Sequence, residues 1–227
     1  MVNACDCRGE AGSNNDRMDA PATDRTGGST RERLMRSALK LFADKGFAGT
    51  TVGDIEGDAG LAARGGGFYR HFPSKEGVLA AAVDNHIRET EQGQAAVLGL
   101  LPLGDLRSEL TLVCRWLLGA IEQQRDLFRV VERDGDRFPE LRDRCRVHLI
   151  DAAHLAAVEF TTRWAAETSH PSRDPQASAA IMIGAVFNYC HCRWTYGQSP
   201  LGVDEDRFIG SWVDYCYDLM TGSAGSA

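Results

Sequence analysis

The segment 50–77, TTVGDIEGDAGLAARGGGFYRHFPSKEG, constrains the fold of this chain more than any other part of it. The segment begins with a short apolar repeat at helical spacing, formed by Val52, Ile55 and Ala59. Threonine precedes this repeat and Gly60 follows it, and these residue types favour a helix start and a helix end respectively. A second short helix is predicted near 62–71, and Ser74 is then expected to cap a long helix. This order is typical of a helix-turn-helix, in which the second helix fits the major groove of B-DNA.

The rest of the chain from Ser29 onward keeps the same helical periodicity. Ser29 or Thr30 is expected to cap a first helix, which Gly46 ends. Later helices include three predicted spans, 75–98, about 175–196 and about 204–220. Proline or aspartate stands where several of these helices begin, at Pro139, Asp174 and Asp204. Because strand alternation and Asn-Gly hairpins are absent from the sequence, the predicted fold is all-α.

The sequence divides into three parts by composition. Residues 1–28 are rich in Gly, Asn, Asp and Ser, so we expect a flexible N-terminal arm that includes Cys5 and Cys7. Residues 29–74 form the predicted helix-turn-helix domain. A larger helical domain is predicted over residues 75–227.

Charge is distributed unevenly along the chain, whose net charge is -7. Residues 24–77 hold nine Lys/Arg against seven Asp/Glu, whereas residues 78–227 hold fourteen against twenty-one. A mildly basic segment joined to an acidic body suits a protein that contacts DNA with one end only.

The sequence carries no signal for export or membrane insertion. The N-terminal residues lack an apolar core region, and no uninterrupted apolar run reaches about 18 residues. An odd count of seven cysteines in such a chain favours reduced thiols. We therefore expect a cytoplasmic protein that has no membrane partner.

Several residues of the helix-turn-helix are suited to DNA contact. Helix N-termini carry free N–H groups and a partial positive charge, which suit a phosphate. A guanidinium near the start of the second helix, that of Arg64, can bind guanine O6 and N7 together. Phe68 and Phe72 are expected in the core. The predicted DNA contacts are Thr50, Thr51, Arg64, Gly65, Tyr69, His71 and Lys75.

An ordered set of motifs gives this segment a family resemblance. Thr51-Val52, Asp54-Ile55, Ala59-Gly60-Leu61 and the run Gly67 to Glu76 (GFYRHFPSKE) resemble the signature of TetR-family transcriptional repressors. The resemblance covers roughly residues 30–80. It implies a homodimer with an N-terminal three-helix DNA-binding domain and a larger helical domain that binds a small molecule and forms the dimer. By position, it also implies phosphate contacts for Thr51, Tyr69 and Lys75.

The resemblance implies a ligand-responsive repressor that leaves a pseudo-palindromic DNA operator when a small effector binds. The aromatic content of the C-terminal domain favours a hydrophobic or aromatic effector. No cofactor, metal site or catalytic residue is predicted, so we do not expect an enzyme. Helix 75–98 joins the two domains and is the expected lever between them.

The sequence departs from the family pattern in one place. Between Ile55 and Phe68 it is two residues longer than usual, which leaves the register of the base-reading residues open over 61–67. Each of the three glycines at 65–67 disfavours a helix by about 0.8–1 kcal/mol relative to Ala. We therefore expect the start of the recognition helix to fray in the free protein.

Two further sites are predicted in the C-terminal domain. Aromatic and polar side chains between its helices are candidates for the effector pocket: Arg115, Trp116, His148, Trp164, Asn188 and Tyr189. The last two helices are apolar on more than one face, which favours burial against a second copy. The predicted dimer interface contains Tyr189, Trp194, Phe208, Trp212 and Tyr215.

Alternative hypotheses remain open at this point. The first is a repressor that senses oxidation through its thiols. The second is an all-helical enzyme that uses the C-terminal cavity, although no Ser-His-Asp order, metal motif or phosphate loop supports it. The motif Cys190-His191-Cys192 cannot converge on one ion from a helix, because adjacent residues diverge by about 100°. His148 and His154 lie near an apolar stripe and are interpreted as core residues.

Overall fold

The computed structural model describes residues 28–62, 66–168 and 174–222, and every regular element in these ranges is helical. The first part of the chain forms α1 (Thr30–Gly49), α2 (Val52–Asp58), the 3₁₀ turn η1 (Phe68–Arg70) and α3 (Lys75–Leu98). The middle contains α4 (Leu106–Gln123), α5 (Arg125–Asp134), α6 (Pro139–Cys145), the π-helical turn η2 (Arg146–Asp151) and α7 (Ala152–Thr168). The chain then forms α8 (Pro175–Tyr196), the 3₁₀ turn η3 (Pro200–Gly202) and α9 (Glu205–Thr221). The all-α prediction is confirmed.

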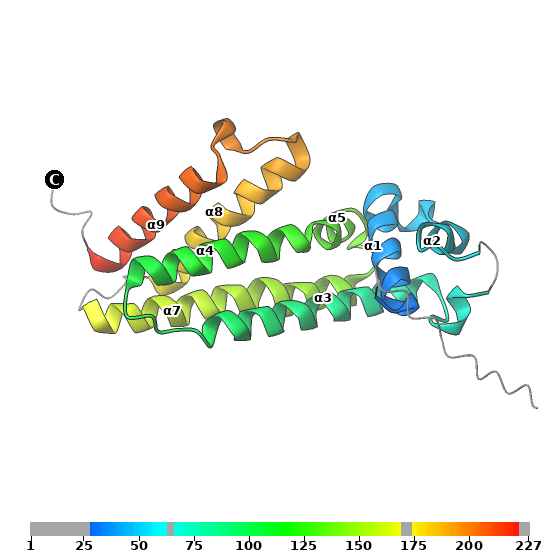
Figure 1. The fold of residues 1–227 in the computed structure, drawn as a ribbon, viewed down its shortest axis with the longest axis horizontal. Coiled ribbons are helices and arrows are strands. Elements are labelled where there is room, and N and C mark those ends of the chain that lie inside the picture. The colour runs from blue at the N-terminus through cyan, green and yellow to red at the C-terminus, as the bar shows by residue number, and fades with distance from the viewer. Residues whose placement is uncertain (1–27, 63–65, 169–173, 223–227) are drawn as a thin grey trace, which may run out of the picture.

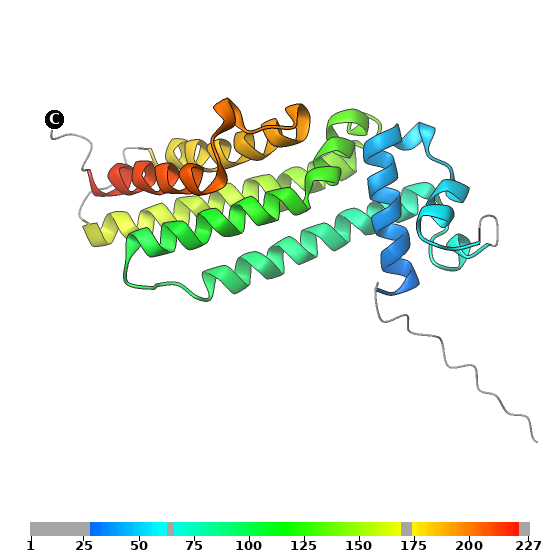
Figure 2. The same ribbon diagram turned by 45° about the horizontal axis from the view of Figure 1, so that its top comes forward.

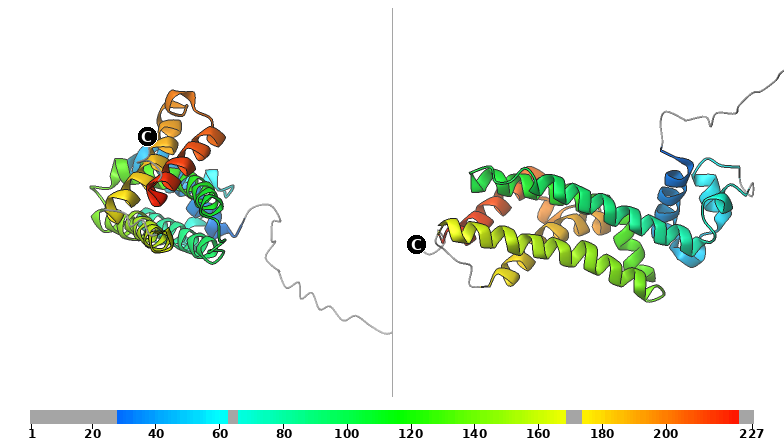
Figure 3. Two further views of the ribbon diagram at one scale, coloured as in Figure 1. Left: turned by 90° about the vertical axis from the view of Figure 1, so that its left-hand side faces the viewer. Right: turned by 90° about the horizontal axis from the view of Figure 1, so that it is seen from below.

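The helices form an elongated bundle with a small unit at one end. Helices α3, α4 and α7 run along its length, and α1 and α2 lie at one end (Figure 1). Helices α8 and α9 pack against α7 and α4 on one side of the bundle (Figure 2). The last described residues lie at the end opposite α1 and α2, as the right-hand view of Figure 3 shows. The predicted DNA-contacting end therefore lies opposite the last described residues of the chain.

Local capping explains where most helices begin. Ser29 and Glu32 form a reciprocal capping box at the start of α1. The Asp174 side chain accepts the backbone N–H of Ala177 at the start of α8, and the Asp204 side chain accepts that of Arg207 at the start of α9. Pro139 occupies the first turn of α6. These starts, and the bounds of α3, agree with the sequence-based prediction.

Gly60 ends α2 with a complete Schellman motif. Its φ is +72°, in the left-handed region that glycine adopts without strain. The N–H of Gly60 donates to the carbonyl of Gly57 at 3.1 Å, and the N–H of Leu61 donates to that of Glu56 at 2.8 Å. The helix thereby turns sharply at the position that the sequence indicated.

The structure corrects the prediction of a recognition helix over 62–71. Residues 63–65 lie outside the described residues, and beyond them only the short turn η1 is helical. Gly66 has a φ of +71°, which is incompatible with a right-handed helix. Glycine disfavours the helix by about 0.8–1 kcal/mol per residue, and this cost is consistent with the non-helical backbone of the described residue Gly66. The predicted fraying at Arg64 and Gly65 lies outside the described residues.

Two hydrophobic clusters fill the interior. One cluster joins α1, α2, η1 and α3 to residues of the larger helical part, including Leu127, Val130 and Leu149. The other lies among α4, α7, α8 and α9. The first cluster crosses the predicted boundary between residues 74 and 75, so helix α1 shares its core with α5 and α6.

Candidate DNA-binding surface and effector cavity

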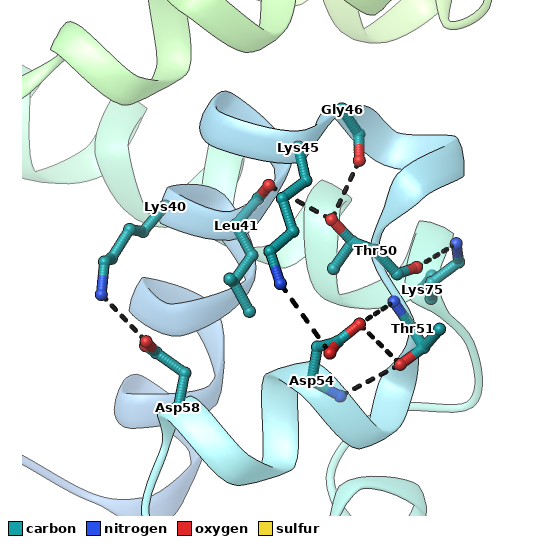
Figure 4. Close-up of polar contacts among 9 residues, drawn as sticks. All are labelled: Lys40, Leu41, Lys45, Gly46, Thr50, Thr51, Asp54, Asp58 and Lys75. Carbon is teal, nitrogen blue, oxygen red and sulfur yellow. Dashed lines mark hydrogen bonds and ion pairs between the residues drawn. The ribbon is translucent and has the colours of Figure 1, made fainter.

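Two adjacent threonines at the α1–α2 junction have different tasks (Figure 4). The Thr51 hydroxyl accepts the N–H of Asp54 at 3.1 Å, and the Asp54 carboxylate accepts the N–H of Thr51 at 2.9 Å. Thr51 is thus the exposed N-cap of α2, where a phosphate could meet a helix N-terminus. The structure corrects the prediction that Thr50 contacts DNA. Its side chain is 1% exposed, and its hydroxyl donates to the carbonyl of Gly46 at 2.9 Å.

Lys75 is held at the same junction. Its ammonium donates to the carbonyls of Phe47, at 2.9 Å, and Thr50, at 2.6 Å. It also lies 4.5 Å from the centroid of the Phe47 ring. The side chain therefore satisfies carbonyls that the end of α1 leaves open. A phosphate contact by Lys75 stays a prediction, and only its third N–H would serve that contact.

The turn η1 presents polar side chains to solvent. Tyr69 is 63% exposed, and Arg70 and His71 are also exposed. Phe68 and Phe72 point into the core, as predicted, with 0% and 2% exposure. This alternation orients the tyrosine hydroxyl outward while the flanking phenylalanine rings hold the turn in place.

A buried glutamate fixes the position of η1. Glu56 is 2% exposed, and its Oε1 accepts the N–H of Phe68 at 3.0 Å. Sequence reasoning missed this residue. The available signal was an acidic side chain only one position after Ile55 on the buried side of a short helix.

Ion pairs fasten α2 to α1. Lys40 contacts Asp58 at 2.9 Å, and Lys45 contacts Asp54 at 3.8 Å (Figure 4). The hydrogen bond from Lys40 lowers the pKa of Asp58, and the same contact raises the pKa of Lys40. Both lysines are thus already paired, which leaves Thr51 and the η1 side chains as the better-placed DNA contacts.

Two adjoining cavities lie inside the larger helical part. The first, here called the bundle cavity, lies among α3, α4, α7, α8 and α9. The second, the α5 cavity, lies beside it and also reaches Gln124 and Phe128. Both are lined by the same five residues on their common side: Gln94, Trp116, Leu117, Ala153 and Ile183.

Only Trp116 among the predicted pocket residues lines these cavities. The prediction is wrong for four of the others, because their side chains have other partners or face solvent. Arg115 pairs with Asp206, His148 is exposed and contacts Glu91, and Asn188 is exposed. Trp164 is buried and donates to Glu109 at 2.8 Å.

The predictions that place Tyr189 in the pocket and in the dimer interface are also corrected. Its hydroxyl donates to the carbonyl of Val203, and its ring stacks on Phe208 with the centroids 4.2 Å apart. His154, interpreted as a core residue, lines the α5 cavity, and its Nδ1 lies 2.7 Å from the carbonyl oxygen of Ile150.

The predicted dimer residues divide between the core and the surface. Trp212 is 5% exposed and donates to the carbonyl of Met182, so it belongs to the core of its own chain. Trp194 donates to Glu122 at 2.8 Å within the chain. Tyr215 faces solvent, with 58% exposure. Helical periodicity alone did not separate these faces.

Burial raises the thiol pKa of the buried cysteines. Burial raises the pKa of the Cys114 and Cys216 thiols to about 12 and that of Cys145 and Cys190 to about 11. Within the described ranges, no group of three or more His, Cys, Asp or Glu residues could hold a metal ion. Cys5 and Cys7 lie outside the described residues.

No helix in the described part of the chain is both long and apolar enough to span a bilayer.

The all-α fold with a capped helix-turn unit at one end resembles the architecture of helix-turn-helix proteins. Residues 34–82 match the family described as bacterial regulatory proteins, tetR family. The repressor KstR2 of Mycolicibacterium smegmatis is 44% identical over 57 residues, which are 25% of this chain and 27% of that protein. The curated relatives are thus matched over less than a third of their own length.

Solved structures share the fold over nearly their whole length. A TetR-family regulator from Mesorhizobium loti MAFF303099 has a TM-score of 0.64 at 16% identity, covering 85% of this chain and 96% of that one. AibR, solved in complex with isovaleryl coenzyme A and operator DNA, has a TM-score of 0.61 at 15% identity, covering 82% and 97%. Residues 34–82 are thus similar to the tetR family of bacterial regulatory proteins, and the solved structures share the fold of the chain.

Proposed function

We propose that this protein is a ligand-responsive transcriptional repressor that binds a pseudo-palindromic DNA operator as a homodimer in the cytoplasm. The proposal rests on the match of residues 34–82 to the tetR family, together with the exposed Thr51 and Tyr69 of that segment. The repressor KstR2 is 44% identical over 57 residues of the chain, which supports repression.

DNA contact is proposed at the surface formed by the N-terminus of α2 and the turn η1. Thr51 offers a helix N-terminus to a phosphate, and Tyr69 and His71 offer hydrogen-bonding side chains. Arg70 adds an exposed cation beside them. Base reading is assigned to the segment 61–67, in which the register of Arg64 stays a prediction.

Helix α5 is the proposed link between ligand and DNA. Gln124, the residue before α5, and Phe128 on α5 line the α5 cavity. At its other end, Arg133 donates to the carbonyls of Ala43 and Asp44, and Asp134 accepts the N–H of Phe47. A displacement at the cavity therefore reaches the end of α1 through a single ten-residue helix. Helix α3, the lever expected from the sequence, is the longer of the two proposed links.

A ligand acts on DNA binding only through its preference for one conformation. The bundle cavity and the α5 cavity have free volumes of about 40 and 50 Å³. Sites for drug-sized ligands typically have about 300–1,000 Å³. An effector must therefore push helices apart, and it favours the conformation in which α5 has moved. By linkage, that conformation's weaker DNA affinity releases the operator.

The dimer is proposed to form through the outer faces of α8 and α9. Ile181 and Tyr215 are 53% and 58% exposed, and small residues beside them allow close approach. Gly184 and Gly210 are among these small exposed residues, and their Cβ positions are free of neighbours within 4 Å. A two-fold pairing of α8 and α9 would place both DNA-binding ends on the same side of the dimer.

Selection from a randomised duplex library tests the proposed function. The recovered duplexes should share two half-sites whose centres lie about 34–36 Å apart or a multiple of this distance. Binding should weaken steeply as salt rises, since phosphate contacts release counterions. Recovery of no duplex with salt-dependent affinity would contradict the proposal. Unchanged DNA binding in the presence of diamide would exclude thiol sensing.

A further inference from the structure

The lining of the two cavities indicates the chemistry of the effector, and this inference rests on the proposed function. No Asp, Glu, Lys or Arg is among the described residues that line either cavity. Most lining residues of the bundle cavity are aliphatic or aromatic. The lining side chains that carry polar atoms are those of Gln94, Trp116 and Trp212, which are all uncharged, and the Trp212 N–H donates to the Met182 carbonyl.

The α5 cavity adds a small set of uncharged hydrogen-bonding groups. Its polar lining residues are Thr90, Gln94, Trp116, Gln124 and His154. Gln124 donates its amide to the Thr90 hydroxyl at 2.9 Å, so its side-chain carbonyl stays available as an acceptor. The carbonyl of Ile150 lies 2.7 Å from His154 Nδ1. This contact requires a proton on Nδ1, so a neutral imidazole has Nε2 left to accept.

Burial of an ionised ligand in either cavity would be unfavourable. A carboxylate or phosphate taken out of water needs a cationic partner or several N–H donors, and otherwise its burial is strongly unfavourable. A ligand hydroxyl or carbonyl, in contrast, finds both donors and acceptors among Gln94, Gln124 and His154. The apolar remainder of the ligand would fit the alanine-rich face of α7 at Ala153, Ala156 and Ala157.

We propose that the effector is an uncharged, largely apolar molecule with a hydroxyl or carbonyl group at one end. Its apolar body lies in the bundle cavity, and its polar end lies in the α5 cavity near Gln94 and Gln124. Anionic ligands of the same size, such as free fatty acids, are excluded because no lining side chain neutralises them.

Calorimetric titration of the full chain with matched pairs tests the proposal. The probes are 1-octanol against octanoate and 2-naphthol against 2-naphthoate, at about pH 7.5. The neutral member of each pair should bind at least about tenfold more tightly than the anion. Ala156→Trp, which fills the bundle cavity, should abolish binding of the neutral probes. The matched control Ala166→Trp, on the exposed face of α7, should retain it.

A second variant pair tests the role of charge. Gln94→Arg adds a cation to the wall shared by both cavities and should raise octanoate affinity at least about tenfold. Gln92→Arg, on an exposed position of the same helix, should not. Octanoate binding as tight as 1-octanol binding, or no binding of either neutral probe, would overturn the proposal. DNA affinity of the ligand-free protein is measured separately, so a failure to bind DNA contradicts the proposed function and leaves the ligand preference intact.

Discussion

The Asp134 carboxylate accepts the backbone N–H of Phe47 at 3.0 Å, across 87 positions of sequence. Phe47 follows Gly46, whose φ of +76° interrupts the helical hydrogen bonding of α1. The interruption exposes an N–H that no carbonyl within the helix accepts, and the end of α5 supplies its acceptor. On the other side of the same residue, Lys75 holds the Phe47 carbonyl. Phe47 is therefore the point at which α1, α3 and α5 meet.

Replacing Asp134 with alanine should uncouple the two parts of the protein. The lost acceptor leaves the Phe47 N–H unsatisfied in a partly buried place, which costs about 1–3 kcal/mol of unfolding free energy. Urea unfolding measures this loss. The ratio of DNA affinities without and with 1-octanol should fall towards one. Asp136→Ala is the matched control, because Asp136 is exposed and pairs only at the surface with Arg142. An unchanged affinity ratio in Asp134→Ala would contradict the proposed route through α5.

Removing the Glu56 carboxylate should disturb the DNA-contacting turn. In Glu56→Ala, the buried N–H of Phe68 loses its acceptor, at a cost of about 1–3 kcal/mol. Glu56→Gln keeps a carbonyl oxygen at the same place and should recover much of that loss. We expect affinity for all duplex sequences to fall in Glu56→Ala, because Tyr69 is displaced. Equal DNA affinity in the two variants would show that η1 is positioned by other contacts.

Both threonine substitutions should lower stability, but only substitution of Thr51 should weaken DNA binding directly. Thr50→Val removes the hydroxyl that donates to Gly46 and Leu41, so the fold should lose stability. Thr51→Ala removes a helix cap worth about 0.5–2 kcal/mol and also weakens DNA binding. Thr50→Ser keeps the hydroxyl donor and is the control variant for Thr50→Val. A Thr50→Val protein with full stability and poor DNA affinity would return Thr50 to the DNA-binding surface.

The sequence predicted the elements whose signals are local. The caps Asp174 and Asp204 and the bounds of α3 follow from residues within one helical turn. Long-range contacts were not predictable in this way. Lys75 is at once a motif residue and the partner of carbonyls 25 and 28 positions earlier, and no local pattern indicates the second role.

The glycine run was a partial success of sequence reasoning. Gly65, Gly66 and Gly67 carry a helix penalty, yet the order of helix and turn signals in the segment still predicts a helix over 62–71. The left-handed φ of Gly66 shows that this residue is not part of a right-handed helix. Pocket residues were harder to predict, since any aromatic side chain of an amphipathic helix suits either a core or a cavity wall.

Thiol reactivity should follow burial. The thiolate is the reactive form, and a folded-state pKa of about 12 leaves almost none of Cys114 ionised near neutral pH. We therefore expect iodoacetamide at about pH 8 to label Cys192, which is partly exposed, well before the four buried cysteines. Mass spectrometry of the labelled peptides measures this order. Rapid labelling of Cys114 in the folded protein would mean that the α4–α9 packing opens readily.

The same shift predicts a loss of stability at high pH. The unfolded thiol ionises near its ordinary pKa of 9.0, whereas the folded Cys114 thiol keeps its proton up to about 12. Between these values the native state binds more protons, so the unfolding free energy falls as pH rises. The expected slope is about 1.4 kcal/mol per pH unit for each such thiol. Cys114→Ala should remove its share of this slope, and an unaltered slope in that variant would contradict the assignment.

The surface of α8 and α9, rather than their buried side, should control dimerisation. Ile181→Arg together with Tyr215→Arg places charge on the exposed faces and should yield a stable monomer in sedimentation velocity. Trp212→Ala should instead lower the unfolding free energy by about 3–5 kcal/mol, because it empties a core position and leaves the Met182 carbonyl without its donor. Leu155→Arg is the control for an exposed apolar residue on α7. A dimer that survives the double substitution would place the interface on another face, and the two DNA-binding ends would then need a different two-fold axis.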